Sequence, residues 1–268
     1  MRAARTGATV RRVRLYDHGA EADEDEMVER LVREIRDSTR LVALTWVHSS
    51  TGVKIPLQRI AERMAEVNRG RPEDRRALVS VDAVHALGVE DFTVGPLGVD
   101  FLAAGTHKWL NGPRGTGIVY GASRSHDAVE PVIPTFTRDA GWGGRMSPGG
   151  FHAFEHRWAV EQAFALQESL GRPAIQAHVH GLATELKQGL ASIRGLTLHT
   201  PPSPRVSSGI VCFELGGRSA RDVVAALHDQ GIMASTTPYD PSYARLTPGL
   251  MNSSADVARA VDAVRAIA

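Results

Sequence analysis

Short apolar runs of strand length recur along the first half of the chain, and amphipathic stretches separate them. These runs predict strands at residues 8–15, 41–47, 77–81, 99–104 and 117–120. The run at 41–47 reads LVALTWV, and its almost unbroken apolar character is typical of a strand buried on both faces. We therefore expect a sheet with both faces covered at the centre of this region.

Helical periodicity fills the gaps between these runs. Residues 23–36 place Met27, Leu31 and Ile35 on one face and concentrate acidic side chains in the first turn, which complements the helix dipole. Pro56 opens a second pattern of the same kind, because proline is well suited to the first turn of a helix. The alternation of strands and helices predicts an α/β fold, doubly wound around a mostly parallel sheet.

The pattern then changes. Residues 121–150 are rich in proline and glycine and predict a long loop, a kind of segment that often carries function. Two long helical patterns follow at 151–170 and 173–193, and the rest of the chain returns to short strands and helices. We predict a larger α/β domain at residues 1–165 and a smaller α+β C-terminal domain at residues 166–268.

Composition and charge narrow the classes of function. The chain carries 31 basic and 30 acidic residues, so its net charge of +1 favours neither nucleic acid nor an anionic membrane. No apolar run approaches the ~20 residues of a membrane-spanning helix. The basic N-terminus lacks the apolar stretch of a secretory signal, so we expect a cytoplasmic protein. Cys212 is the only cysteine, which excludes an internal disulfide and a cysteine-based metal cage.

Polar side chains follow three of the predicted strands. They are residues 48–51, then Asp82 and His85, and then Thr106 and Lys108. Because ligands of open α/β sheets bind at the carboxyl ends of the strands, we expect these groups to converge. Pyridoxal phosphate requires such a set: a lysine for the Schiff base, a carboxylate for the pyridine nitrogen, and hydroxyls or amides for the phosphate.

Each of these signals also has an ordinary explanation. An aspartate after a strand is often only a turn residue, a single histidine is usually structural, and a lysine between glycines is usually solvated. Only the conjunction of Asp82 with Lys108, at the ends of successive strands, favours a cofactor site.

The spacing of the residues does not match three other ligand-binding motifs, namely the Walker loop, the dinucleotide fingerprint and the H-E-x-x-H zinc motif. The stretch GPRGTG has no lysine after its last glycine, as a Walker loop requires, and its glycines lead into a strand instead of the helix of a dinucleotide fingerprint. The sequence has no H-E-x-x-H, and His178 and His180 diverge on a helix, so we expect no metal site.

The sequence resembles the class V aminotransferase family of fold-type I pyridoxal phosphate enzymes, and is most similar to its isopenicillin N epimerase-like branch. The resemblance covers essentially the whole chain. The matching stretches are VSVDAVHALGV (79–89), LGVDFLAAGTHKWLNGPRGTGIVYG (97–121), GGFHAFEHRWAVEQAF (149–164) and YARLTPGLMNSSADV (243–257).

This resemblance implies roles for individual residues. Lys108 would form the Schiff base with pyridoxal 5'-phosphate, and Asp82 would pair with the pyridine nitrogen. His85 would lie near the phenolic oxygen of the cofactor, and Thr106 and His107 would contact its phosphate.

The resemblance also implies a substrate and an assembly. Arg245 falls where the family binds the carboxylate of its substrate, an amino acid or related amine; its ordinary alternative is a surface arginine near a strand end. A homodimer is expected, with residues 135–150 near the active site of the partner.

Two departures from the family pattern stand out. Ser49 and Ser50 follow the strand after which the family usually has an asparagine. In addition, the first residues resemble the middle of the family's large domain, beyond the segment with its phosphate-binding turn and ring-stacking group. We therefore expect this chain to be N-terminally short and to leave part of an apolar sheet face uncovered.

The expected activity is a reaction at the α-carbon of the substrate, as in an aminotransferase or epimerase. Cys212 lies in the apolar strand pattern GIVCFEL, where a buried, inert thiol is expected, so a desulfurase that acts through a persulfide is disfavoured. Two alternatives stay open. One is C–S lyase-type β-elimination without a catalytic cysteine, and the other is a truncated, non-catalytic pseudoenzyme or fragment.

Overall fold

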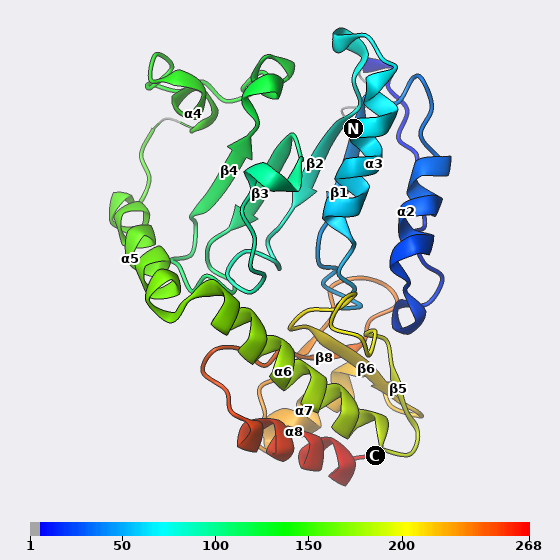
Figure 1. The fold of residues 1–268 in the computed structure, drawn as a ribbon. Helices are drawn as coiled ribbons and strands as arrows, with labels where there is room; N and C mark the ends of the chain where they lie inside the picture. The colour runs from blue at the N-terminus through cyan, green and yellow to red at the C-terminus, as the bar shows by residue number, and fades with distance from the viewer. Residues whose placement is uncertain (1–5, 149) are drawn as a thin grey trace.

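The computed structural model describes residues 6–148 and 150–268. Within this part of the chain, the first sheet has four strands in the order β1-β2-β3-β4. Its first three strands are parallel and β4 is antiparallel to β3. The prediction of an α/β fold with a mostly parallel sheet is thus confirmed (Figure 1). The strands are β1 (Leu41–Thr45), β2 (Leu78–Asp82), β3 (Phe101–Gly105) and β4 (Gly117–Gly121).

Two helices cover one face of this sheet. They are α2 (Glu24–Arg33) and α3 (Leu57–Arg69), which lie side by side in Figure 1. The carboxylate of Asp23 accepts hydrogen bonds from two amides of the first turn of α2, as an N-cap should. Met27 and Met64 are fully buried between these helices and the inward-facing strand positions. The core of this part of the molecule therefore lies between the helix pair and the sheet.

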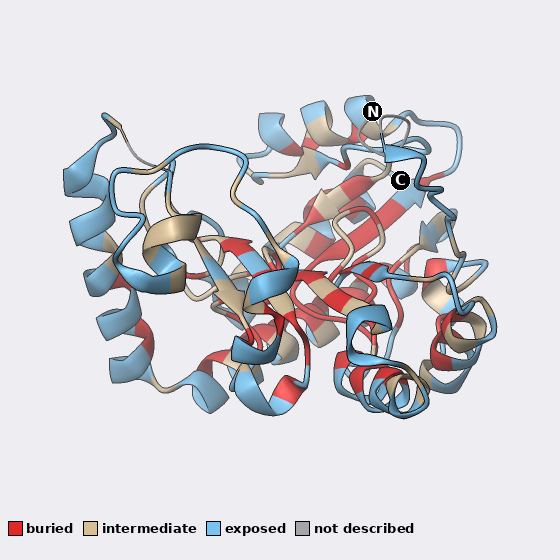
Figure 2. Cartoon of the chain, turned by 90° about the horizontal axis from the view of Figure 1, so that it is seen from above, coloured by how far each residue is buried: buried red, intermediate tan, exposed pale blue. Residues whose placement is uncertain are grey.

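The opposite face of the sheet is largely bare. Alternate positions of β1 are exposed, and Leu41 and Val119 are each 57% accessible. A groove of about 940 Å³ runs along this face, with Phe101, Trp142 and Met146 in its lining. The prediction that residues 41–47 are buried on both faces is therefore wrong, because among the described residues no helix layer packs on the second face. Figure 2 shows buried positions gathered along the central strands and broad exposed surface around them.

The segment at residues 8–15 does not form a strand. Val10 is 77% exposed, and Arg11 forms an ion pair of 2.7 Å with Glu34, just beyond α2. With Arg11, Arg12 and Arg14 among its eight residues, the segment has too few apolar side chains to bury a strand face. The predicted strand was wrong for this reason.

A second sheet and three helices form the C-terminal part of the molecule. The strand order is β5-β6-β8-β7 and all pairs are antiparallel. Its own hydrophobic core includes Phe213 and Leu227, both fully buried. The elements are α6 (Arg172–Ala191), β5 (Leu196–Leu198), β6 (Val211–Leu215), α7 (Ala220–Asp229), β7 (Ser235–Thr236), β8 (Ala244–Leu246) and α8 (Ser254–Ala266).

Helix α5 (Phe154–Leu170) runs along the side of the molecule and leads into α6 (Figure 1). Its side chains are largely exposed, including Trp158 at 72% and Leu166 at 45%. The preceding loop is not entirely irregular. It contains the 3₁₀ segment Ser123–Ala128 and the short helix α4 (Gly141–Met146), which is held by Trp142 stacked on His126 at 4.6 Å.

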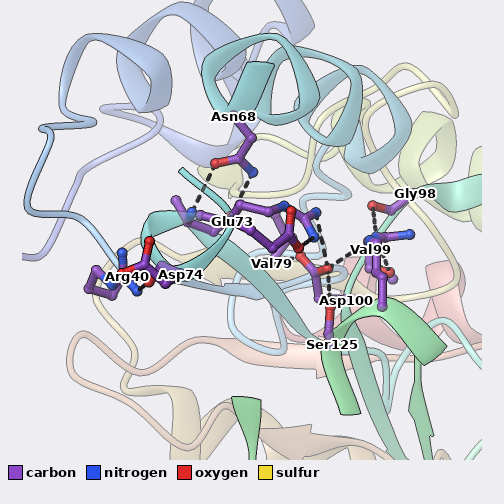
Figure 3. Close-up of polar contacts among 12 residues, drawn as sticks. Arg40, Asn68, Glu73, Asp74, Val79, Gly98, Val99, Asp100 and Ser125 are labelled. Atoms are coloured by element: carbon purple, nitrogen blue, oxygen red, sulfur yellow. Dashed lines mark hydrogen bonds and ion pairs between the residues drawn. The ribbon is translucent and has the colours of Figure 1, made fainter. Parts of the chain in front are cut away.

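Asp100 fastens the first sheet at the end opposite to the predicted site. Its buried carboxylate accepts hydrogen bonds from the Val79 amide at 2.8 Å, the Ser125 hydroxyl at 2.6 Å and the Arg124 Nε at 3.0 Å. Figure 3 shows Asp100 between Val79 and Ser125. These bonds connect the start of β3 to β2 and to the segment after β4. They fix the relative positions of the strands at the end of the sheet opposite to the predicted site.

Candidate functional site

The carboxyl ends of neighbouring parallel strands bring the predicted polar groups to one edge. Asp82 is the last residue of β2 and pairs in register with Thr45 of β1 and Ala103 of β3. Its side chain is exposed, and Oδ1 accepts a hydrogen bond of 3.0 Å from the amide of Val84. One carboxylate oxygen is therefore oriented by the backbone, and the group remains open to a ligand.

Lys108 lies in the loop that joins β3 to β4. The loop is closed by the Asn111 amide donating to the Lys108 carbonyl and by the Gly112 amide donating to the Thr106 carbonyl. Asn111 adopts a left-handed conformation, with a φ of 60°. The Lys108 side chain is exposed at the same sheet edge as Asp82, so the two groups leave adjacent strands as predicted.

Thr106 occupies a different environment from the one its predicted role suggests. It is fully buried, and its hydroxyl contacts the Thr116 hydroxyl and the Pro113 carbonyl. In this structure Thr106 holds the two ends of the loop together, and its contact with phosphate stays a prediction. His107 is exposed beside Lys108 and is free to face an anion.

Gly88 packs directly against the backbone of the Lys108 loop. Its φ is +91°, and a Cβ at this position would lie 2.4 Å from the Leu110 nitrogen. Neither the left-handed conformation nor the contact with backbone atoms can accommodate a side chain without movement. Gly88 thus supports the loop that positions Lys108.

We expect Gly88→Ala to lower the free energy of unfolding by about 2–3 kcal/mol, the sum of backbone strain and overpacking. Gly115→Ala is the matched control, because Gly115 also has a positive φ but no atom within 4 Å of its Cβ position. Urea denaturation of both variants measures the difference. Equal losses of stability would show that the contact with the loop is unimportant.

His85 is buried in the same region, and its Nδ1 has no hydrogen-bond partner among the described residues. Burial, together with the positive charges of Lys108 and Arg245, lowers the pKa of His85 to about 4. The ring is therefore neutral near pH 7 and offers one unoccupied polar atom. Buried polar atoms are normally satisfied, so an unpartnered one next to a cavity indicates a place for a ligand.

Arg245 reaches the site from the second sheet. It lies on β8, its Nε donates to the Ser235 hydroxyl at 3.1 Å, and its Nη1 donates to the Ser49 carbonyl at 3.2 Å. The Ser49 contact links this arginine to the segment after β1. Arg245 is thereby fixed in place. Residues 48–51 do not line the cavity described below, and their role at the site stays a prediction.

A cavity of about 340 Å³ joins these groups, because Lys108, His85 and Arg245 all line it. The predictions from sequence did not include Trp109, Gly249 or Met251, which also line it. Trp109 was identifiable as the neighbour of the predicted lysine, whereas nothing in the local sequence marks the other two. Asp82 and His107 are not part of the lining and lie at the sheet edge outside it.

These residues fit pyridoxal phosphate. An amine, an exposed carboxylate at a strand end and a neutral, unpartnered imidazole are the groups that its aldehyde, pyridine nitrogen and phenolic oxygen need. Lys108 and Arg245 give the cavity a positive character suited to an anionic ligand.

The residues at 6–148 and 150–268 give less support to a metal site or to a membrane-spanning helix. This part of the chain contains no group of three or more metal-ligating side chains. His178 and His180 bond to different partners, the Asn252 carbonyl and Glu90, and so diverge as the helical spacing predicts. No described helix has the length and apolar character needed to cross a bilayer.

Known proteins resemble the chain in sequence. The model of a family described as aminotransferase class-V matches residues 1–238. Isopenicillin N epimerase of Streptomyces clavuligerus is 26% identical over 99% of this chain and 69% of its own length. The isopenicillin N epimerase of Amycolatopsis lactamdurans is 28% identical over 71% of this chain and 50% of its own length. A cysteine desulfurase of Yersinia pestis is 28% identical over 87% of this chain and 59% of its own length. The chain thus spans between half and about two thirds of the length of these relatives.

Solved structures share the fold. A cysteine desulfurase of Thermococcus onnurineus matches with a TM-score of 0.83 at 21% identity, over 99% of this chain and 67% of its own. A variant of C-DES with glycine covalently linked to its pyridoxal phosphate matches with a TM-score of 0.84 at 22% identity. The match covers 98% of this chain and 69% of the C-DES chain. The fold, the cofactor-compatible groups and a family match that covers most of the sequence agree, and the chain belongs to the class V aminotransferase family of fold-type I pyridoxal phosphate enzymes.

Proposed function

We propose that this chain holds pyridoxal phosphate on Lys108 and acts at the α-carbon of an amino acid or related amine, as an aminotransferase or an epimerase-like enzyme. One observation carries the proposal: Lys108, His85 and Arg245, from both parts of the molecule, line the same cavity. The similarity to isopenicillin N epimerases gives additional support.

Each residue has a defined task in this proposal. Bound pyridoxal phosphate supplies an electron sink for negative charge at the α-carbon. Lys108 would hold the cofactor through its amine and would move a proton at the α-carbon. The carboxylate of Asp82 would pair with the protonated pyridine nitrogen, and the guanidinium of Arg245 would bind the substrate carboxylate.

His85 would act as a neutral hydrogen-bonding group. Its lowered pKa keeps the imidazole uncharged near pH 7, so that Nδ1 can bond to the phenolic oxygen without adding charge to an already positive site. His107 would face the phosphate from the exposed side of the loop.

Covalent labelling tests the proposal directly. The protein is incubated with pyridoxal phosphate, treated with borohydride to fix any lysine-bound cofactor, and digested for peptide mass spectrometry. We expect the added mass on the peptide that contains Lys108, in preference to Lys54 and Lys187. Labelling spread over all lysines, or none at Lys108, would favour the alternative that this chain is a non-catalytic fragment or pseudoenzyme.

A second candidate reaction is C–S lyase-type elimination, which the similarity to cysteine desulfurases favours. A persulfide route fits the structure poorly. Cys212 is fully buried, and burial raises the pKa of its thiol to about 12 although the charge of Arg245 acts in the opposite direction. Elimination would therefore have to proceed without a cysteine nucleophile. Release of pyruvate, ammonia and sulfide from cysteine would indicate elimination. Exchange of the α-hydrogen without release of ammonia would indicate the aminotransferase or epimerase-like reaction.

The buried state of Cys212 has a measurable consequence. We expect a thiol reagent such as Ellman's reagent to react with no group in the native protein and with one group after denaturation, because only an accessible thiolate is nucleophilic. Rapid reaction in the native state would reopen the persulfide route.

A homodimer is proposed on the family resemblance. The exposed Phe154, Trp158 and Leu166 of α5 are suited to a contact between protomers. Sedimentation equilibrium of the wild type and of Trp158→Glu tests this, and a monomeric wild type would contradict it. A cytoplasmic location stays a prediction.

A further inference from the structure

The cavity beside Lys108 has a lining that changes in character away from its two charged groups. Among the described residues, Lys108 and Arg245 are the only charged side chains in the lining near pH 7, because the pKa of His85 is lowered to about 4 and its imidazole is neutral. The rest of the lining is uncharged: Trp109, Val179, Leu250 and Met251 are apolar, and Asn111, Thr247 and Asn252 are polar. Among the described residues, no carboxylate lines this space.

The apolar wall is built by a close contact between large side chains. Trp109 and Val179 both pack against Gly209, where an added Cβ would lie 2.5 Å from the indole and 2.7 Å from the valine. Gly209 therefore lets the indole and Val179 approach the second sheet. The indole of Trp109 and the side chain of Val179 are therefore closely packed at this part of the lining.

Gly249 also lies near the indole, but it leaves more room than Gly209 does. A Cβ at this position would meet one neighbour, Cζ3 of Trp109, at 3.9 Å, which is an ordinary contact. The φ of Gly249 is not in the left-handed region, so alanine can be accommodated there. Because Gly249 also lines the cavity, its missing side chain contributes directly to the free volume.

We propose that this cavity selects an amino acid with one carboxylate and an uncharged, largely apolar side chain, and that Gly249 sets the size of side chain it admits. The inference rests on the proposed function. An α-amino acid presents an amine, a carboxylate and a side chain at one carbon. With the amine at Lys108 and the carboxylate at Arg245, the side chain is left facing the uncharged remainder of the lining, to which Trp109 and Val179 contribute apolar surface.

Charge and volume both support this selection. A cationic side chain would approach Lys108 and Arg245 with no carboxylate to pair with, and burial of an unpaired charge is unfavourable. A second carboxylate would find Arg245 already occupied. The cofactor on Lys108 would occupy part of the volume of about 340 Å³, which is already at the low end of the ~300–1,000 Å³ of small-molecule sites, so a small substrate fits best.

Equilibrium binding to the cofactor-loaded protein tests the proposal. Alanine, leucine, glutamate and lysine are titrated separately, and binding is measured by the change in cofactor absorbance and by calorimetry. We expect leucine to bind most tightly and lysine at least about tenfold more weakly, in line with the discrimination that pocket contacts provide. Equal affinities for leucine and lysine would overturn the proposal.

Two variants probe the lining itself. Gly249→Ala should weaken leucine binding several-fold and leave alanine binding nearly unchanged, whereas equal effects on both would contradict the role of Gly249. Met251→Asp places a carboxylate at the exposed mouth of the cavity, where Met251 is 95% accessible, and should strengthen lysine binding relative to leucine. Met233→Asp is the matched control, because Met233 is 84% accessible and lies outside the lining.

Failure of the selectivity can be distinguished from failure of the proposed function. If cofactor is attached at Lys108 and the four amino acids bind without the expected order, only the selectivity is wrong. If borohydride fixes no cofactor at Lys108, the proposed function is wrong and the selectivity with it.

Discussion

Lys108→Ala is expected to lose the visible absorbance of bound pyridoxal phosphate completely. The wild type, incubated with the cofactor and passed through gel filtration, should retain the band, because the lysine amine is the covalent attachment point. The variant should elute without it. The substitution should cost little stability, because the Lys108 side chain is exposed and the loop is held by the Lys108 backbone, which the substitution keeps. The fold should therefore survive, as circular dichroism can verify.

Arg114→Ala is the matched control for this experiment. Arg114 lies in the same glycine-rich loop and is also exposed and basic, but it does not line the cavity. We expect this variant to keep the visible band. Retention of an identical band by Lys108→Ala would mean that the lysine does not carry the cofactor, and the assignment of the site would fail.

Glu90→Ala is expected to lower the free energy of unfolding by about 3–5 kcal/mol, the cost of removing one partner from a buried ion pair. The Glu90 carboxylate accepts hydrogen bonds from the Lys54 amine at 2.9 Å, His180 Nε2 at 2.8 Å and the Ser208 hydroxyl at 2.5 Å. These partners come from the segment after β1, from α6 and from the segment before β6, so Glu90 joins the two parts of the molecule. Its loss leaves the partly buried charge of Lys54 without a counterion.

Guanidinium denaturation measures this loss, and Glu73→Ala provides the control. Glu73 pairs with Arg76 at 3.2 Å but is 82% exposed, so its removal should cost no more than about 1 kcal/mol. Similar losses for both variants would show that the Glu90 cluster contributes no more than a surface pair.

The Glu90 cluster also predicts how stability depends on pH. Burial raises the pKa of Glu90, but the hydrogen bond from His180 and the charge of Lys54 outweigh it and leave the pKa below its ordinary value. A carboxyl group with a lowered folded-state pKa stabilises the fold above its unfolded-state pKa, and this contribution is lost as pH falls through the folded-state pKa. The wild type should therefore lose more stability on acidification than Glu90→Gln does.

The candidate site was largely predictable because its chemistry is local in sequence. Asp82 and Lys108 each follow an apolar run directly, and parallel strands bring such residues to one edge without further information. Arg245 was found only through the family resemblance, since its distance from the cavity depends on how the second sheet packs. The apolar run LVALTWV by itself predicted burial on both faces, and the expectation of an uncovered sheet face came from the family resemblance. The alternating burial of β1 shows that one face is exposed.

The sequence by itself determined most of the succession of strands and helices, the positions of Lys108 and Asp82 after adjacent strands, and the family, because these depend on periodicity and on short motifs. Tertiary structure alone decided that Gly249, Val179 and Trp109 line one cavity and that Glu90 meets His180 and Ser208, partners 90 and 118 residues away. Side chains so far apart have no common periodicity in the sequence. Only the packing of α6 and the second sheet against the segments that follow the strands of the first sheet brings them together. This packing also forms the cavity whose shape and charge we propose to select the substrate.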